Sequence, residues 1–145
     1  MGIEPERVLA LADEMAGRPA EEDAGRSALA VLAAHAALEA MVNQLGAETI
    51  PSFNYRARFL PKWHDLCERT IGRQLEAAPD LERIQALRDA VVGYRGETER
   101  LDRRSTSPAP EAPREIGADE ARWAVESARR VIAEFSVAGR DAPSS

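Results

Sequence analysis

The sequence predicts an all-α protein, an antiparallel bundle of four to five helices. Three observations favour this fold: alanine and leucine are abundant, runs of β-branched residues are few, and apolar residues recur mainly at spacings of three and four. No segment reads as a convincing strand. The chain has 145 residues, 44% of them apolar, so a single domain can bury a sizeable core without a metal ion or a disulfide.

The first two helices are expected before residue 46. One is predicted from Pro5 to Met15, because proline is acceptable at an early helical position and Gly17 follows as a stop. The second is predicted from Ala24 to Leu45, ending at Gly46. Its stretch 28–42 is apolar almost all round, which is typical of a helix in the centre of a bundle.

Two further helices are expected in the middle of the chain. Residues 50–53 form a break, where Ser52 is a candidate cap for a short helix that leads into a longer one from about Pro61 to Arg73. Asp80 is an N-cap candidate for a helix from Leu81 to about Val92.

The remainder of the chain is predicted to be a loop, a last helix and a tail. Residues 97–117 are polar and include the Ser-, Thr- and Pro-rich segment 105–113, so we expect a flexible loop there, with phosphorylation as an open question. The last helix is expected from Asp119 to near Gly139, followed by a disordered tail over 140–145. The single domain therefore spans residues 1–139.

Charge and cysteine content favour a soluble cytoplasmic protein. Nineteen basic and 25 acidic residues give a net charge of −6, which argues against non-specific coating of nucleic acid. Cys67 is the only cysteine, so no internal disulfide can form. Glu4 and Glu6 do not suit a secretory signal, and His35 and Glu39 interrupt the longest apolar run. We expect no membrane segment and no DNA binding.

Basic residues gather between positions 54 and 73 although the chain is acidic overall. This basic surface comprises Arg56, Arg58, Lys62, Arg69 and Arg73. The simpler interpretation is a solvated helix face, and the alternative is a surface that binds phosphate groups or a partner.

A polar stripe crosses the apolar second helix, formed by His35, Glu39 and Asn43 at positions i, i+4 and i+8. Buried polar groups need hydrogen-bond partners, and the candidates are Arg88 and Asp89, with Arg88 placed to bind Glu39. The main interpretation is a structural cluster that fixes helix register. A pocket for a ligand or RNA is the sharper alternative, and full exposure of the stripe is the third.

Metal and cofactor chemistry find little support. His64 has Asp65 and Cys67 as neighbours, but a metal site needs three or four convergent ligands and no second Cys/His cluster exists. The phosphate-binding, zinc-protease and nucleophile-elbow motifs are absent as well. We expect no metal and no cofactor.

Several segments resemble HEPN-like helical domains. RSALAVLAAHAALEAMVN, residues 26–43, is similar to the long second helix of many such proteins, and FLPKW at 59–63 and Leu87-Arg88-Asp89 follow in the expected order. The resemblance covers residues 26–138 loosely. In that family, an arginine and a histidine from two protomers meet at a dimer interface and promote attack by an RNA 2′-hydroxyl group on the adjacent phosphate.

The corresponding motif is degenerate in this chain. Arg88 stands at the arginine position, but the positions expected for the histidine hold Gly93, Tyr94 and Arg95. Without an imidazole that titrates near neutral pH the proton transfer has no carrier, and a tyrosine hydroxyl is too weak an acid to replace it. We call Arg88, Asp89 and Tyr94 the motif remnant, and expect neither catalytic residues nor appreciable ribonuclease activity.

The leading functional hypothesis is a non-catalytic HEPN-like interaction module that binds a protein partner or itself, as a homodimer through the face near Arg88 and Tyr94. The alternative is a toxin-type protein that binds RNA through the basic surface or still cuts RNA by an unusual route. A third possibility is a small-molecule site at the polar stripe, which requires a pocket there.

Overall fold

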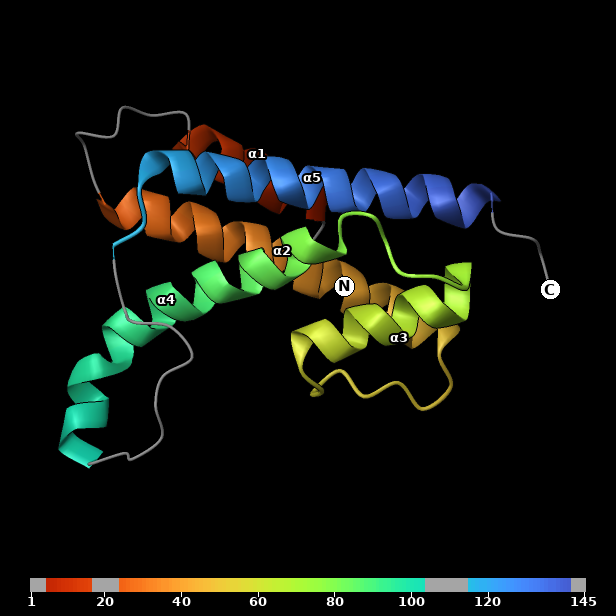
Figure 1. The fold of residues 1–145 in the computed structure, drawn as a ribbon, viewed down its shortest axis with the longest axis horizontal. Helices are drawn as coiled ribbons and strands as arrows, with labels where there is room; N and C mark the ends of the chain where they lie inside the picture. The colour runs from red at the N-terminus through yellow and green to blue at the C-terminus, as the bar shows by residue number, and fades with distance from the viewer. Residues whose placement is uncertain (1–4, 17–23, 104–114, 142–145) are drawn as a thin grey trace.

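The computed structural model describes residues 5–16, 24–103 and 115–141, and at residues 11, 13–16, 24 and 94–103 it describes the backbone alone. Every regular element within these ranges is a helix, as predicted, and none is a strand (Figure 1). The five helices are α1 (Pro5–Ala16), α2 (Ala24–Thr49), α3 (Phe59–Ile71), α4 (Ala78–Arg103) and α5 (Ala118–Asp141).

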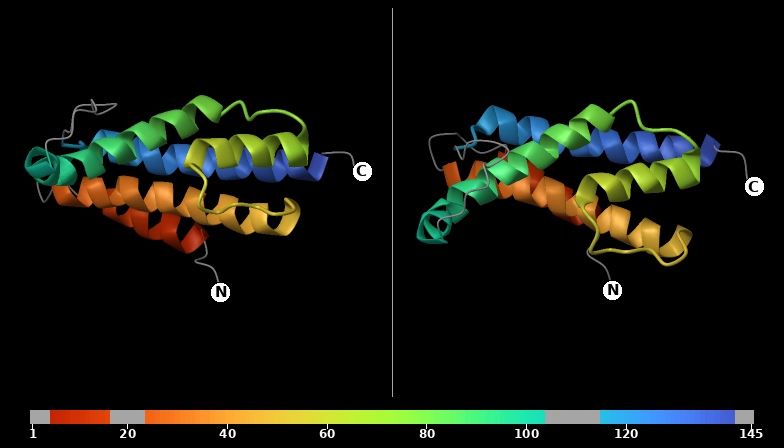
Figure 2. Two further views of the ribbon diagram at one scale, coloured as in Figure 1. Left: turned by 90° about the horizontal axis from the view of Figure 1, so that it is seen from below. Right: turned by 60° about the horizontal axis from the view of Figure 1, so that its bottom comes forward.

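Helix α2 lies at the centre and packs against all four other helices. In Figure 1, α1 and α5 lie above α2, and α3 and α4 lie below it. The left view of Figure 2 shows α1 on the opposite side of α2 from α3 and α4. The pairs α1–α2, α3–α4 and α4–α5 run in opposite directions, whereas α2, α3 and α5 point the same way (Figure 1). The packing is therefore antiparallel between most sequence neighbours but not throughout.

The core combines small residues of α2 with large residues of the surrounding helices. Ala30, Ala34 and Ala37 are fully buried, which lets neighbouring helices approach α2 closely. Trp63 of α3 is also fully buried and meets Phe135 of α5 edge to face, with 5.9 Å between ring centroids. This contact lies where α3 packs against α5 and fixes α3 to the bundle.

Helix α2 does not end at Gly46 as predicted. It continues to Thr49, and the N–H of Ile50 still donates to the carbonyl of Gly46 at 2.8 Å. The reason for a glycine here is the Phe53 ring, because a Cβ at position 46 would lie 2.5 Å from the Phe53 Cζ. Gly46 permits close packing inside the helix rather than terminating it.

Helix α3 starts at Phe59, two residues before the predicted position, and no side chain caps its N-terminus. Ser52, the predicted cap, instead occupies a turn with φ of 58°. At the other end the chain leaves the helix at Gly72, which has φ of 72° and donates its N–H to the carbonyl of Cys67 at 3.0 Å.

Helix α4 starts at Ala78, so Asp80 lies in its first turn and is not the N-cap that was predicted. A residue of α5 holds the chain directly before the helix: the Glu134 carboxylate accepts hydrogen bonds from the N–H groups of Glu76 at 2.7 Å and Ala77 at 2.9 Å. A contact with a residue 57 positions away in the sequence leaves no local signal.

Parts of the predicted loop and tail are helical. Residues 97–103 belong to α4, and α5 includes Arg140 and Asp141. The segment 105–113 and residues 142–145 lie outside the described residues.

Length and composition alone would allow the stretch Gly25–Thr49 of α2 to cross a membrane. The core helix of a soluble protein meets the same criteria, and α2 is packed against four other helices. The expectation of a soluble, cytoplasmic protein stays a prediction.

Candidate functional site

A pocket of about 630 Å³ opens where α2, α3 and α4 meet, and we call it the interhelical pocket. The polar stripe and the motif remnant both contribute to it. Its polar lining consists of His35 and Glu39 from α2, Arg58 directly before α3, and Gln85, Arg88 and Asp89 from α4. Phe59, Leu60 and Pro61, the first three residues of α3, form its apolar wall.

His35 is held on two sides. Its Nε2 lies 2.9 Å from the Gln85 Oε1, and its ring stacks on the Phe59 ring with 4.2 Å between centroids. Burial lowers the pKa of His35 below its usual value of 6.5, so the imidazole is neutral at neutral pH. The Arg88 guanidinium disfavours protonation as well, whereas the hydrogen bond to Gln85 favours it.

A hydrogen-bond chain runs from His35 across α4. Gln85 donates its Nε2 to the Asp89 Oδ1 at 2.8 Å, so its carbonyl oxygen faces His35 and the imidazole Nε2 is the donor in that contact. Asp89 also accepts from the Arg88 Nη1 at 3.3 Å. Asp89 therefore joins the polar stripe through Gln85, a residue that the sequence analysis did not single out.

Glu39 pairs with Lys62 and not with Arg88 as expected. The Lys62 Nζ donates to the Glu39 Oε1 at 2.5 Å, to the Asn43 Oδ1 at 2.8 Å and to the backbone carbonyl of Tyr55 at 3.0 Å. These three contacts use all three donors of the ammonium group. The polar stripe is thus divided, with His35 bound to α4 and the other two residues bound to α3.

Lys62 was assigned to the basic surface, but it is buried, with 2% exposure. Its register could have indicated this, because Phe59, Lys62 and Leu66 follow the spacing of the apolar face of α3 and both neighbours in that series are buried. Lys62 is therefore an internal residue whose charge is matched by Glu39.

Of the other four residues of the basic surface, two are paired with carboxylates and two are not. Arg69 pairs with Asp65 at 2.9 Å, and Arg73 pairs with Glu134 at 3.5 Å. Arg56 and Arg58 are exposed and form no ion pair within the part of the chain that the structure describes.

The motif remnant is only partly described. Arg88 and Asp89 line the interhelical pocket with side-chain exposures of 41% and 34%. The side chain of Tyr94 lies outside the described residues. His64 is exposed on α3, away from the buried face of that helix. Within the described ranges, no group of three or more His, Cys, Asp or Glu residues is placed to hold a metal ion.

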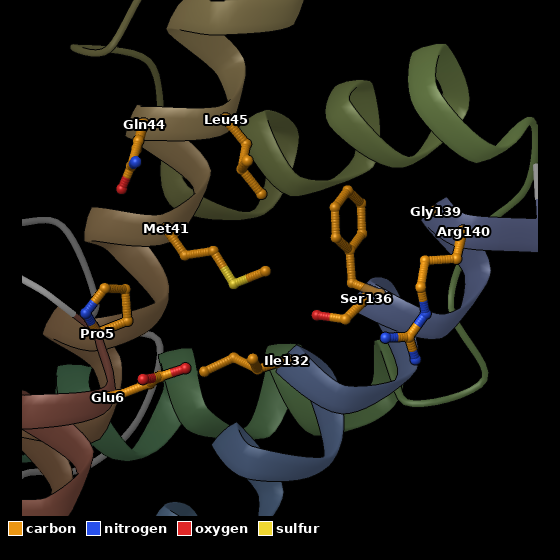
Figure 3. Close-up of a pocket in the computed structure, with 10 residues that line it drawn as sticks. Pro5, Glu6, Met41, Gln44, Leu45, Ile132, Ser136, Gly139 and Arg140 are labelled. Carbon is orange, nitrogen blue, oxygen red and sulfur yellow. The ribbon is translucent and has the colours of Figure 1, made fainter. Parts of the chain in front are cut away.

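A second pocket, of about 650 Å³, lies between α1, α2 and α5 (Figure 3). Met41 extends into it from α2 and Ile132 from α5, and Glu6 and Arg140 lie toward its edges (Figure 3). Its interior is mainly apolar, with Leu45 as a further wall. It offers shape and apolar contact, whereas the interhelical pocket combines apolar contact with a hydrogen-bond chain and two guanidinium groups.

No protein-family model, curated protein or solved structure matches the chain. The resemblance to HEPN-like domains stays a prediction, and the interhelical pocket is the candidate site on its own geometry.

Proposed function

We propose that this protein is a non-catalytic helical interaction module, HEPN-like in its ancestry, which binds a protein partner at the face where α2, α3 and α4 meet. The observation that carries the proposal is the lining of the interhelical pocket, where Arg58 and Arg88 stand beside the apolar wall formed by residues 59–61. Arginine beside apolar and aromatic surface is the composition that dominates binding energy at protein interfaces.

The frame behind this face supports the proposal because it is fixed from inside. Lys62 ties α3 to Glu39 of α2 and also to the carbonyl of Tyr55. That last contact holds the segment between α2 and α3, which ends at Arg58. A surface held in one conformation loses less entropy when a partner binds.

The contacts of His35 support the non-catalytic part of the proposal. General acid–base chemistry needs a group that exchanges a proton with substrate near the working pH. The Nε2 of His35 is engaged by Gln85, and burial disfavours the protonated form that would act as an acid. His35 is better suited to hold α2 and α4 together than to transfer protons.

The RNA-binding alternative has less support. Affinity for a nucleic-acid strand depends on several cations that each neutralise a phosphate. Lys62 is internal, and Arg69 and Arg73 are paired with carboxylates. Arg56 and Arg58 are the only members of the basic surface left to bind phosphate groups, and two cations are too few for an extended strand of RNA.

Affinity capture with pocket variants tests the proposal. Tagged wild-type protein, the double variant Arg58→Ala/Arg88→Ala and the control Arg69→Ala, which changes an exposed arginine outside the pocket, are compared with and without RNase treatment. We expect a protein that the wild type and the control retain, that RNase does not release and that the double variant loses. The purified partner should then bind the double variant at least about tenfold more weakly.

Two outcomes contradict the proposal. One is a partner that all three proteins retain equally, because the pocket is then not the interface. The other is retention that disappears with RNase, which moves RNA binding ahead. Self-association through the same face is the second form of the proposal, and sedimentation of the wild type and the double variant at equal concentration measures it.

A further inference from the structure

We propose that the interhelical pocket binds a single carboxylate group carried on an apolar or aromatic body, with Arg58 and Arg88 as the cationic contacts and residues 59–61 as the apolar wall. The inference rests on the proposed function and names the chemical group through which a partner is recognised. Its basis is the set of charges and unused donors that line this one pocket.

The guanidinium groups of Arg58 and Arg88 have unused N–H donors. A guanidinium carries five N–H donors and matches the geometry of a carboxylate. Within the described residues, the Arg88 side chain donates one hydrogen bond, at 3.3 Å to Asp89, and it is 41% exposed. Arg58 is exposed and forms no hydrogen bond or ion pair through its side chain within the described ranges. Both residues line the same cavity.

The balance of charge favours a monoanion. Four formally charged residues line the pocket: Arg58 and Arg88 are cationic, and Glu39 and Asp89 are anionic. The buried Lys62 ammonium pairs with Glu39 and neutralises its charge. The two arginines and Asp89 then leave the pocket lining with a net charge of +1. A carboxylate neutralises that charge, whereas a phosphate dianion would leave an excess of negative charge beside Asp89.

The start of α3 adds to the attraction. The positive end of a helix dipole favours an anion, and the first turn of α3 contains no acidic residue and no side-chain cap that would already satisfy it. The same turn supplies Phe59 and Leu60 to the wall, so the group that carries the carboxylate meets apolar surface. The Phe59 ring is itself fixed by stacking on His35.

A binding titration with matched probes tests the inference. The acid probe is N-acetylphenylalanine and its neutral partner is N-acetylphenylalanine amide. The peptide probes are the capped dipeptides Glu-Phe and Gln-Phe, which place the carboxylate on a side chain. Inorganic phosphate and a single-stranded oligouridine complete the set. Binding is measured on the full chain by amide chemical-shift changes, with wild-type protein and the variants Arg58→Gln, Arg88→Gln and Arg69→Gln.

We expect each acid to bind at least about tenfold more tightly than its amide, because charge-assisted hydrogen bonds to guanidinium are lost with the charge. Arg58→Gln and Arg88→Gln should each lower the affinity for the acid probes by a similar factor. Arg69→Gln should leave the affinity for the acid probes unchanged. Tighter binding of the capped Glu-Phe identifies a partner side chain as the source of the carboxylate. Tighter binding of N-acetylphenylalanine identifies a free acid or a chain terminus.

Three outcomes overturn the inference: no binding of either acid up to the limit of probe solubility, equal binding of acid and amide, or tighter binding of phosphate or oligouridine than of the acids. These results are distinguishable from failure of the proposed function. A partner whose capture still depends on Arg58 and Arg88 while every carboxylate probe fails would leave the interaction module standing and remove only this chemistry.

Discussion

Lys62 of α3 lies inside the molecule and pairs with Glu39 of α2, with 2.5 Å between Nζ and Oε1. The pair connects the core to the candidate site, because Glu39 also lines the interhelical pocket. A buried ammonium is tolerated when its charge is matched and its donors are satisfied, and here Asn43 and the Tyr55 carbonyl complete the set. One side chain thus fixes α2, α3 and the segment between them.

Replacement of Lys62 by methionine should destabilise the protein strongly. The change leaves the Glu39 carboxylate without its cation and the Tyr55 carbonyl without its donor. Removal of one partner from a buried pair costs about 3–5 kcal/mol, and we expect the lower end because the Glu39 side chain is 33% exposed. Urea unfolding followed by circular dichroism measures the change.

A double substitution and a surface control make this prediction specific. Lys62→Met combined with Glu39→Leu should recover most of the loss, because no unpaired charge remains. Arg69→Met, which breaks the exposed pair with Asp65, should cost less than about 1 kcal/mol. Equal losses for Lys62→Met and Arg69→Met would contradict a structural role for the internal pair.

The sequence predicted the helices better than their ends. Helical periodicity is repeated many times along each segment, so the five helices could be placed from local pattern alone. The ends depend on contacts that are distant or specific: Phe53 against Gly46, and Glu134 at the start of α4. Each error in a helix boundary at these two places reflects a tertiary contact that overrides a local signal.

Most charged residues of the candidate site could be predicted from the sequence, but Gln85 and the pairing of these side chains could not. His35, Glu39, Arg88 and Asp89 were singled out, and all four line the interhelical pocket. Their partners could not be deduced, because a charge pattern does not say which of several cations reaches a given carboxylate. The burial of Lys62 could have been predicted, because its spacing from Phe59 and Leu66 places it on the apolar face of α3.

The stability of the protein should fall as the pH drops below 6.5, and His35 should account for part of the fall. Burial holds its folded-state pKa below the unfolded value of 6.5. Between those two values the unfolded chain binds more protons, so the contribution of His35 is complete above pH 6.5 and is lost as the pH falls through the folded pKa. Thermal unfolding between pH 7.5 and 5 in about half-unit steps measures the slope.

Two histidine variants test whether His35 causes this dependence of stability on pH. His35→Gln keeps a polar group near Gln85 and removes the titration, so the dependence of the midpoint on pH should become shallower. His64→Gln removes the only other histidine, at an exposed position of α3, and should leave the dependence as in the wild type. The reverse assignment would show that the interhelical pocket does not hold His35 in its neutral form.

Cys67 should resist thiol reagents in the folded protein. It is 1% exposed, and burial raises the pKa of its thiol from 9.0 to about 11, with the nearby carboxylates of Glu134 and Glu68 acting in the same direction. The pKa shift alone lowers the thiolate fraction about 100-fold, and burial blocks access as well. Ellman's reagent at pH 8 should therefore label the native protein at least about 100-fold more slowly than the urea-unfolded chain. Rapid stoichiometric labelling without denaturant would contradict the packing of α3 against the core.

Gly46→Ala should destabilise the protein even though alanine is the better helix former. At an open helical position this change gains about 1 kcal/mol, but here the new Cβ meets the Phe53 ring at 2.5 Å from Cζ and still closer to Cε2. Overpacking of this kind costs about 1–3 kcal/mol, so the net effect should be a loss.

Gly139→Ala is the matched control, because a Cβ there meets nothing within 4 Å in α5, and it should stabilise the protein by up to about 1 kcal/mol. Urea unfolding compares both variants with the combination Gly46→Ala/Phe53→Ala, in which the overlap is removed. The alanine at position 46 should be less damaging in the Phe53→Ala background than in the wild type, since its penalty comes from the ring. A stabilising Gly46→Ala, equal to Gly139→Ala, would mean that the Phe53 ring moves aside freely and does not anchor the segment that leads to Arg58.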